Sequence, residues 1–323
     1  MKQLLATFVL AILLTCCKKT GSEKELQNSS WITVTRLNNP DHRFRDIDFV
    51  NEKDGYALAI EGILGNHSLW YTNNGGEIWK SNSFVFKDEF PNSIAINGTT
   101  VFCVGKSIYC STDKGSTWKN LNPPFEGYRD IQFLNKNTLI VGNANIIRRS
   151  TDGGNTWQEV FNSNIRASFK KFFFTVHQTG YAIAGETYDN TNFGIVAKTI
   201  DNGLTWRILD KRFVNVTDIF FLNDKIGFVF TFNYELFKTL DGGDTWILVS
   251  NKSPDAYPNS YFLSEKEAYI GGYRGIFHTL DGGITWKEEY KAQDSVVNKI
   301  IYNGKSLYAI TGNGAILTKK NNN

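Results

Sequence analysis

One eight-residue frame recurs along this chain of 323 residues and constrains its fold more than any other feature. The frame reads Ser/Thr-x-Asp-x-Gly-x-x-Trp, and its clearest copy is the Ser-Thr-Asp-Gly-Gly-Asn-Thr-Trp of 150–157. Five copies carry aspartate at the third position and a sixth carries asparagine: Asn74, Asp113, Asp152, Asp201, Asp241 and Asp281. Successive frame tryptophans are 39, 39, 49, 40 and 40 residues apart. A period of this size indicates one supersecondary unit copied several times.

Each part of the frame has a physical role in a tight turn. The aspartate can accept hydrogen bonds from backbone N–H groups two residues further on. The glycine can adopt φ > 0, which hairpin turns require and most other residues resist. The tryptophan begins the next strand, and burial of its ring contributes a gross gain of roughly 4–6 kcal/mol. The frame therefore predicts a turn held by an aromatic side chain.

The stretches between the frames predict the number of units. Short apolar phrases that open a unit occur seven times, at 46–49, 93–96, 130–133, 172–174, 218–221, 260–262 and 299–302. Trp31-Ile32-Thr33-Val34 resembles the last strand of a unit, although no frame precedes it. Ile316–Thr318 resembles a third strand, and no tryptophan follows it. Pairing these two segments would close a ring without a gap.

The frames resemble the Asp box, or BNR repeat, of β-propellers. The phrases at 54–57, 179–182 and 225–228 are similar to the glycine-aromatic strand of the Ycf48-like branch, which includes photosystem II assembly factors and bacterial lipoproteins. The resemblance covers residues 31–318. It implies an all-β, seven-bladed β-propeller with an N-terminal strand that closes the last blade. It also implies a scaffolding or assembly role, although sialidases, glycanases and sorting receptors share the box.

The N-terminus predicts export and a lipid anchor. Leu4–Leu14 is apolar but shorter than the about 20 residues that span a bilayer, so residues 1–16 are interpreted as a signal peptide. The following phrase resembles a bacterial lipobox, with Cys17 as the acylated residue and Cys16 as the alternative. An ordinary cleaved secretory signal is the other interpretation. Residues 17–30 are polar and predict a flexible tether, and 31–320 are assigned to the propeller. We expect the protein in the bacterial cell envelope, on the periplasmic or cell-surface side of the outer membrane.

Composition excludes several classes of function. The formal net charge is +3 with 21% charged residues and without a basic run, which does not favour a nucleic-acid binder. The four histidines, His42, His67, His177 and His278, lack the spacing of metal ligands. Phosphate-binding and dinucleotide-binding glycine patterns are missing as well. We expect a monomer without cofactor or metal.

Cys103 and Cys110 flank a segment that we expect to be a hairpin between the second and third strands of a blade. With Lys106-Ser107 as the turn, the two cysteines face one another and can form a disulfide. With Gly105-Lys106 as the turn, they are out of register. An exported protein can keep such a bond, and two separate thiols are the other interpretation.

The sequence favours a binding protein over an enzyme. A sialidase would need three arginines, an acid/base aspartate and a tyrosine–glutamate pair, and only Arg45 falls where such an enzyme carries an arginine. A loop arginine is the favoured explanation of Arg45, because the rest of the sialidase motif is missing. The box aspartates are expected to serve their own turns. A glycoside hydrolase with paired carboxylates, or a carbohydrate-binding lectin, is the alternative.

The binding face is expected on the side opposite the boxes. In a four-stranded blade, the first and third turns share one rim, and the second turns and the links between blades share the other. The second rim collects arginine and tyrosine, which often anchor interfaces. The predicted binding residues are Arg43, Arg45, Tyr128, Arg129, Arg166, Arg212, Tyr273 and Arg274. An acidic protein surface or a carboxylated glycan is the expected partner, and ordinary solvated loops are the other interpretation.

Overall fold

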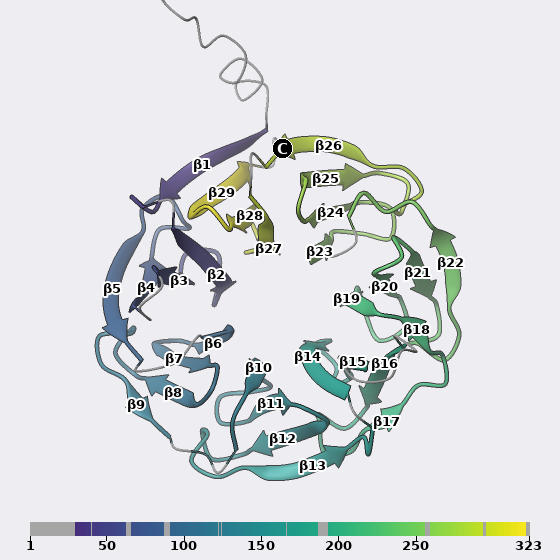
Figure 1. The fold of residues 1–323 in the computed structure, drawn as a ribbon, viewed down its shortest axis with the longest axis horizontal. Coiled ribbons are helices and arrows are strands. Elements are labelled where there is room, and N and C mark those ends of the chain that lie inside the picture. The colour runs from purple at the N-terminus through teal and green to yellow at the C-terminus, as the bar shows by residue number, and fades with distance from the viewer. Residues whose placement is uncertain are drawn as a thin grey trace, which may run out of the picture.

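The structure is a computed structural model that describes residues 30–39, 41–62, 66–86, 91–121, 123, 125–165, 167–186, 193–255, 259–292 and 295–320. Within these residues the secondary structure consists of β-strands in seven sheets, which stand like blades around a central axis (Figure 1). The expected all-β, seven-bladed propeller is confirmed. In the part of the chain that the structure describes, no helix has the length and apolarity to cross a membrane.

Blades one to three each contain four antiparallel strands in chain order. Blade one consists of β2 His42–Phe49, β3 Gly55–Glu61, β4 Asn66–Thr72 and β5 Lys80–Val85. Blade two consists of β6 Ser93–Asn97, β7 Thr100–Val104, β8 Ile108–Ser111 and β9 Lys119–Asn120. Blade three consists of β10 Tyr128–Phe133, β11 Leu139–Asn143, β12 Ile146–Ser150 and β13 Gln158–Asn162.

Blades four to six repeat this order, and blade four has one additional short strand, β18, beside β16. Blade four consists of β14 Ala167–Phe174, β15 Gly180–Glu186, β16 Phe193–Thr199, β17 Arg207–Ile208 and β18 Phe213–Val214. Blade five consists of β19 Val216–Phe221, β20 Gly227–Thr231, β21 Leu236–Thr239 and β22 Ile247–Ser250. Blade six consists of β23 Asn259–Phe262, β24 Ala268–Gly271, β25 Gly275–Thr279 and β26 Lys287–Lys291.

Blade seven closes the ring with strands from both ends of the chain. It consists of β27 Val297–Tyr302, β28 Ser306–Thr311, β29 Ala315–Lys320 and the N-terminal strand β1 Trp31–Arg36. β1 is antiparallel to β29, with Trp31 opposite Lys319 and Arg36 opposite Ala315, and Figure 1 shows these strands side by side in purple and yellow. The predicted closure by the N-terminal strand is confirmed.

The hydrophobic core is divided among the contacts between neighbouring blades. The second strand of a blade has another blade on each side, so β20 is buried at all five positions. One core cluster joins Phe102 and Val104 of blade two to Ile131 and Val141 of blade three. Each blade therefore depends on its neighbours for burial of its apolar surface.

The boxes form the turns between the third and fourth strands. In the box of blade three, the Thr156 N–H donates to Asp152 Oδ1 at 2.9 Å and the Thr156 hydroxyl donates to Oδ2 at 2.6 Å. The Ser150 hydroxyl accepts the N–H groups of Asp152 at 3.4 Å and Gly154 at 2.8 Å. Gly154 has φ +85°, and the Trp157 indole donates to its carbonyl at 3.1 Å. The prediction that the aspartate holds its own turn is confirmed, but Asp152 accepts the N–H of the residue four positions further on. The N–H of Gly154, two positions after Asp152, donates to Ser150 instead.

The other boxes repeat this geometry with one difference from expectation. Backbone N–H groups bond the side chains of Asn74, Asp113, Asp201, Asp241 and Asp281 in their own turns. Among the box tryptophans, Trp79 and Trp206 are buried, whereas the other four are only half-buried. A box tryptophan stands at the start of the outermost strand of its blade, and this strand pairs with another strand on one side only.

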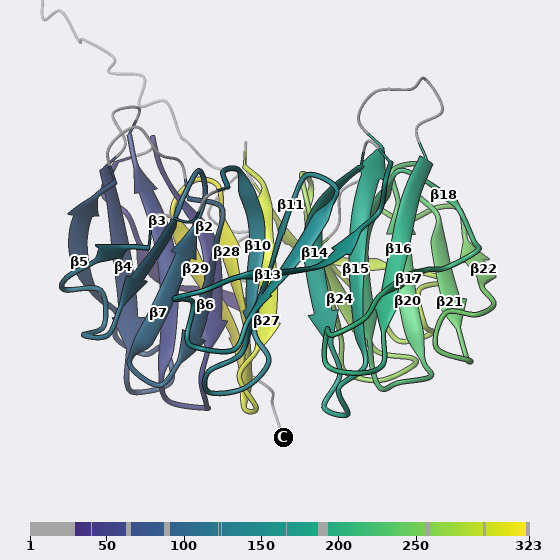
Figure 2. The same cartoon turned by 90° about the horizontal axis from the view of Figure 1, so that it is seen from below.

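The turns divide between two rims as expected. On one rim, Gly153 in a box donates its N–H to Asn137 in a first turn at 2.9 Å. On the other, Gly127 in a link between blades donates to Lys106 in a second turn at 3.1 Å. We call these the box rim and the link rim, and Figure 2 shows the strands running between them.

The hairpin of β7 and β8 separates the two cysteines. Cys103 lies opposite Tyr109 and Phe102 lies opposite Cys110, with residues 105–107 as a three-residue turn. Adjacent positions on a strand point to opposite faces, so the two thiols face away from each other and are not joined. Of the two interpretations of this hairpin, the one with a Cys103–Cys110 disulfide is wrong.

Candidate binding channel

Among the described residues, the inner strands carry a β-bulge at the same place in five blades. Their pairing with the second strand shifts by one residue at Arg45, Arg129, Lys170, Thr217 and Asn298. A bulged residue is left unpaired in the ladder, which re-aims its side chain. All five line one central cavity of about 730 Å³. The bulges therefore supply one layer of the side chains that line the channel.

Three of these five residues are cationic, and we call Arg45, Arg129 and Lys170 the bulge cations. Arg45 Nη2 donates to Asn92 Oδ1 at 3.4 Å. Burial lowers the pKa of Arg45, and the charges of Arg43 and Arg129 lower it further against the opposing effect of Asp46. Burial likewise lowers the pKa of Lys170. Between described residues, the bulge cations form no ion pair with a carboxylate, so they remain available to an anion.

One residue further along the inner strands, a polar belt joins neighbouring blades. Asp46 Oδ2 of blade one accepts the backbone N–H of Ile94 in blade two at 2.8 Å. The same contact joins blades three and four, five and six, and six and seven through Asp130 and Phe172, Asp218 and Ser260, and Asn259 and Ile300. These side chains hold the ring together, because each satisfies a backbone donor of the next blade.

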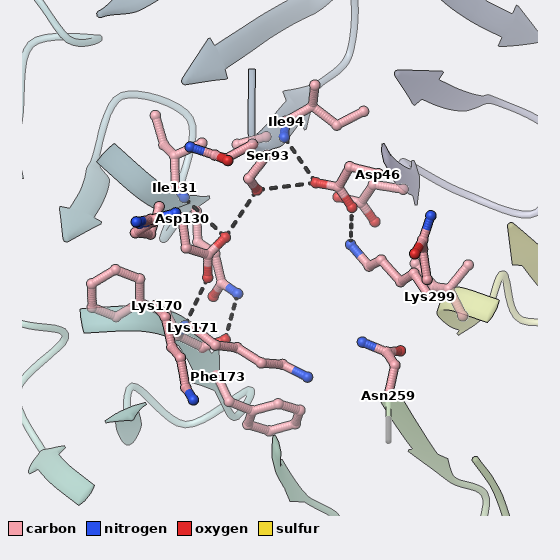
Figure 3. A pocket seen from close by; sticks show the side chains of 18 of the residues that line it. Asp46, Ser93, Ile94, Asp130, Ile131, Lys170, Lys171, Phe173, Asn259 and Lys299 are labelled. Atoms are coloured by element: carbon pink, nitrogen blue, oxygen red, sulfur yellow. Dashed lines mark hydrogen bonds and ion pairs between the residues drawn. The ribbon is translucent and has the colours of Figure 1, made fainter. Parts of the chain in front are cut away.

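Lysines and a serine complete the belt, as Figure 3 shows. Lys299 Nζ lies 2.7 Å from Asp46 Oδ1, and Ser93 Oγ lies between Asp46 and Asp130 at 3.0 and 2.9 Å. Burial opposes the charge of Lys299, but the carboxylates of Asp46, Asp48 and Asp130 outweigh it and raise the pKa of this lysine. Burial raises the pKa of Asp130. The belt is thus a network of mutually compensating charges.

The next layer of the channel includes three aromatic rings and one carboxylate among its described residues. Phe173 and Phe220 have ring centroids 5.0 Å apart, and Phe220 and Tyr261 have centroids 5.1 Å apart. Burial raises the pKa of Asp48 to about 6, although Lys299 acts in the opposite direction. A carboxyl with such a pKa resembles a general acid, but glycoside hydrolysis requires a second carboxylate. The nearby Asp46 is already bonded to a backbone N–H and a lysine.

The structure distributes the predicted binding residues over several places. Arg45 and Arg129 meet at the cavity, and Arg43 is near enough for its charge to act on Arg45. Three further residues, Arg212, Tyr273 and Arg274, are exposed in link-rim segments and are not among the described residues that line the cavity. Arg166, Cys16 and Cys17 lie outside the described residues.

Tyr128 is not a surface residue, contrary to expectation. Only 1% of it is exposed, and its hydroxyl donates to the Phe125 carbonyl at 3.1 Å. It belongs to the core between blades two and three, and burial raises its pKa to about 12. Tyr128 begins the inner strand of blade three, where the ring points between the blades. Its neighbour Arg129, at the bulge, enters the channel instead.

Sequence reasoning missed Lys170, Thr217 and Asn298. Each stands one residue before the belt position, as Arg45 and Arg129 do. An alignment of the seven inner-strand phrases places these residues in one column with Arg45 and Arg129. This shared position is the sequence signal by which they could have been predicted.

Comparisons with known proteins agree with this architecture. Residues 197–322 match the family model described as photosynthesis system II assembly factor YCF48. A structure of YCF48 bound to a D1 peptide is similar with a TM-score of 0.71 and 18% identity, over 91% of this chain and 97% of that chain. YCF48 from Cyanidioschyzon merolae has a TM-score of 0.68 and 17% identity, over 91% of this chain and 99% of that one.

A glycoside hydrolase has the same type of fold over part of its length. The GH74 enzyme of Niastella koreensis has a TM-score of 0.64 and 19% identity, over 84% of this chain and 51% of that chain. No curated protein matches the chain by sequence. The family-model match and the YCF48 structures together support a Ycf48-like β-propeller with BNR repeats.

Proposed function

We propose that this chain is an exported, lipid-anchored binding protein of the Ycf48-like family that binds an acidic segment of a protein partner at its channel. The convergence of the bulge cations Arg45, Arg129 and Lys170 on one cavity carries this proposal. An entering carboxylate would relieve the repulsion between Arg45 and Arg129. It also accepts charge-assisted hydrogen bonds, for which the forked guanidinium groups of arginine are suited.

A protein segment is the better supported occupant. The similar propeller described as YCF48 bound to a D1 peptide supports a peptide in a fold of this type. A carboxylated glycan offers the same charge but has no comparable support. The hydrolase alternative is weaker, because the GH74 enzyme matches over about half of its length and the cavity carboxylates Asp46 and Asp130 already accept backbone N–H groups of the next blade.

The cellular location is part of the same proposal. Acylation at Cys17, or at Cys16, would attach the propeller to a membrane of the bacterial envelope through the polar segment 17–30. The mature protein would then act as a monomeric binding module on the periplasmic or cell-surface side. The family-model match covers only residues 197–322, so family membership of the whole chain belongs to this proposal.

Charge reversal in the channel tests the proposed binding site. Arg45→Glu combined with Arg129→Glu should weaken binding of a fluorescent acidic peptide with a free C-terminal carboxylate about tenfold or more, since two attractive charges become repulsive. The matched control is Lys225→Glu combined with Lys266→Glu, two exposed lysines of the box rim, which should leave affinity unchanged. Fluorescence anisotropy measures both, and thermal unfolding verifies that the variants fold. Equal loss from both pairs, or loss from neither, would contradict the proposed site.

A further inference from the structure

The box rim carries an arc of exposed aliphatic side chains. Between 54% and 73% of each of six side chains is exposed: Ile78, Ile200, Leu204, Leu240, Leu280 and Ile284. All six stand within boxes, and we call them the apolar arc. The side-chain hydrogen bonds of a box use its Ser/Thr, Asp and Trp together with the Thr before the tryptophan, so the side chains of five of the six occupy positions that the turn leaves open. The exception, Ile78, stands in place of that Thr and contributes only its backbone N–H. Leu204 takes part through its backbone, whose N–H donates to Asp201 Oδ1 at 3.1 Å.

The apolar arc is absent from the boxes of blades two and three. It occupies the boxes of blades four, five, six and one. At the positions of Leu240 and Leu280, the boxes of blades two and three carry the exposed residues Thr112 and Thr151. These blades form the same turns with threonine, so the fold does not require an aliphatic residue there. Repeated exposed aliphatic side chains along one rim favour a contact surface there.

Residues of the apolar arc lie in the two blades on either side of the place where the N-terminal segment joins the propeller. Blade seven lies between blades six and one, and its outer strand β1 starts opposite Lys319 at the box rim. Ser30 Oγ and Trp31 Nε1 both donate to Glu289 Oε2 at 3.3 Å, in the strand that follows the last box. The chain before residue 30 therefore meets the propeller on the rim that carries the arc.

We propose that the apolar arc docks on the lipid bilayer, so that the box rim faces the membrane and the link rim faces away from it. This inference rests on the proposed lipid anchor at Cys17 or Cys16. A flexible tether of the length of 17–30 has a root-mean-square span of about 20 Å, which keeps the box rim close to the membrane. The arc would add a second membrane contact beside the anchor and would determine which rim faces the bilayer.

Charges of both signs lie around the arc, which favours a lipid surface without net charge. Lys225, Lys266 and Lys305 are exposed in the first turns of blades five to seven. The box carboxylates, such as Asp241 and Asp281, directly follow arc residues in the sequence and carry the charge opposite to that of these lysines. Because the two signs compensate, the contact is apolar rather than ionic. Binding to zwitterionic phosphatidylcholine should therefore not weaken when salt is raised.

Flotation with phosphatidylcholine vesicles tests this docking. All seven blades lie within residues 31–320, so a chain that starts at residue 18 contains the whole propeller and lacks the apolar run of the signal. This unlipidated chain should float with the vesicles. Changing Leu240→Ser, Leu280→Ser and Ile284→Thr together should lower the partition coefficient at least tenfold. The matched control is Ile247→Ser with Leu248→Ser on β22, which are 60% and 50% exposed and should float like the unchanged chain.

Three results would overturn lipid docking. They are an absence of flotation of the unchanged chain, equal flotation of the arc variant, and equal loss in the control. Arc-dependent binding to protein-containing membrane vesicles, but not to pure lipid, would also overturn it in favour of a protein partner. The chain in this assay carries no acyl group, so a failure of the predicted lipidation appears only in fatty-acid labelling and remains distinguishable.

Discussion

At the scale of single residues, the box aspartate Asp152 and the channel aspartate Asp48 differ in pKa because their surroundings differ. Asp152 is exposed and accepts hydrogen bonds from Thr156 and Ser150, which lower its pKa to about 2. Asp48 lies in the channel, where burial raises its pKa to about 6. Ionised Asp152 therefore favours the folded state, whereas ionised Asp48 opposes it.

Asp48→Asn should stabilise the protein at neutral pH. The carboxyl has a pKa near 6 when folded and near 3.8 ordinarily, so deprotonation favours the unfolded state. The resulting penalty is absent below about pH 4, grows as the pH rises and is complete above about pH 6, where it is at most about 3 kcal/mol. Urea unfolding at several pH values measures the gain. A gain of equal size at acidic and neutral pH would show that ionisation of Asp48 is not its cause.

Asp152→Ala should lower the free energy of unfolding by about 1–3 kcal/mol, because the Thr156 N–H loses its acceptor. Asp152→Asn keeps an oxygen in the same place and should lose less. Binding of the acidic peptide should not change in either variant, since the box lies on the opposite rim. Urea denaturation gives the stabilities, and equal losses in the two variants would argue against the hydrogen bond as their source.

At the scale of elements, β1 has an importance beyond its six residues. Trp31 is 3% exposed, and its ring meets Tyr269 of blade six edge-on with centroids 6.0 Å apart. Lys319, its partner on β29, lies 2.6 Å from Glu289 of the same blade. The strand that closes blade seven thus also secures the contact of that blade with blade six.

Trp31→Ala should lower the free energy of unfolding by about 3–5 kcal/mol, as expected for removal of a buried tryptophan. Deletion of 31–36 should cost at least as much, because blade seven would lose its outer strand. Ile32→Ala serves as the control: this side chain is 49% exposed, and its loss should change stability by about 0.5 kcal/mol or less. Chemical denaturation compares the three variants. A Trp31→Ala protein as stable as the control would mean that β1 does not secure the ring.

At the scale of the whole molecule, the propeller has two unlike faces. The bulge cations lie on inner strands that start at the link rim, whereas the apolar arc lies on the box rim. In the proposed function, a lipid anchor at the N-terminus would attach the box rim to the membrane and leave the channel open to a partner.

Labelling cells with a radioactive fatty acid should mark the full-length protein. Cys16→Ala combined with Cys17→Ala should abolish the label, because both candidate acylation sites are lost, and the single variants identify the acylated residue. Gel electrophoresis and autoradiography provide the measurement. Failure of the unchanged protein to take up label would mean that residues 1–16 form an ordinary secretory signal.

The repeat allowed the fold to be predicted because its chemistry is local. A box closes through hydrogen bonds between residues at most four apart, such as Ser150 and Gly154. Its spacing reveals the blade count, and the unmatched strand at Trp31 reveals the closure. Among the site residues, Arg45 and Arg129 were predicted in segments that enter from the link rim, as the structure has them, since the order of turns determines which rim a segment reaches.

The channel itself was decided only by the tertiary structure. Whether Arg129 or Tyr128 enters the channel depends on a bulge, and whether Cys103 meets Cys110 depends on a three-residue turn. A shift of one residue in strand pairing turns a side chain to the opposite face, and local sequence does not specify that shift. The polar belt depends on contacts between blades, such as Asp46 with Ile94, 48 residues apart. Packing between distant segments therefore determined which side chains share the cavity.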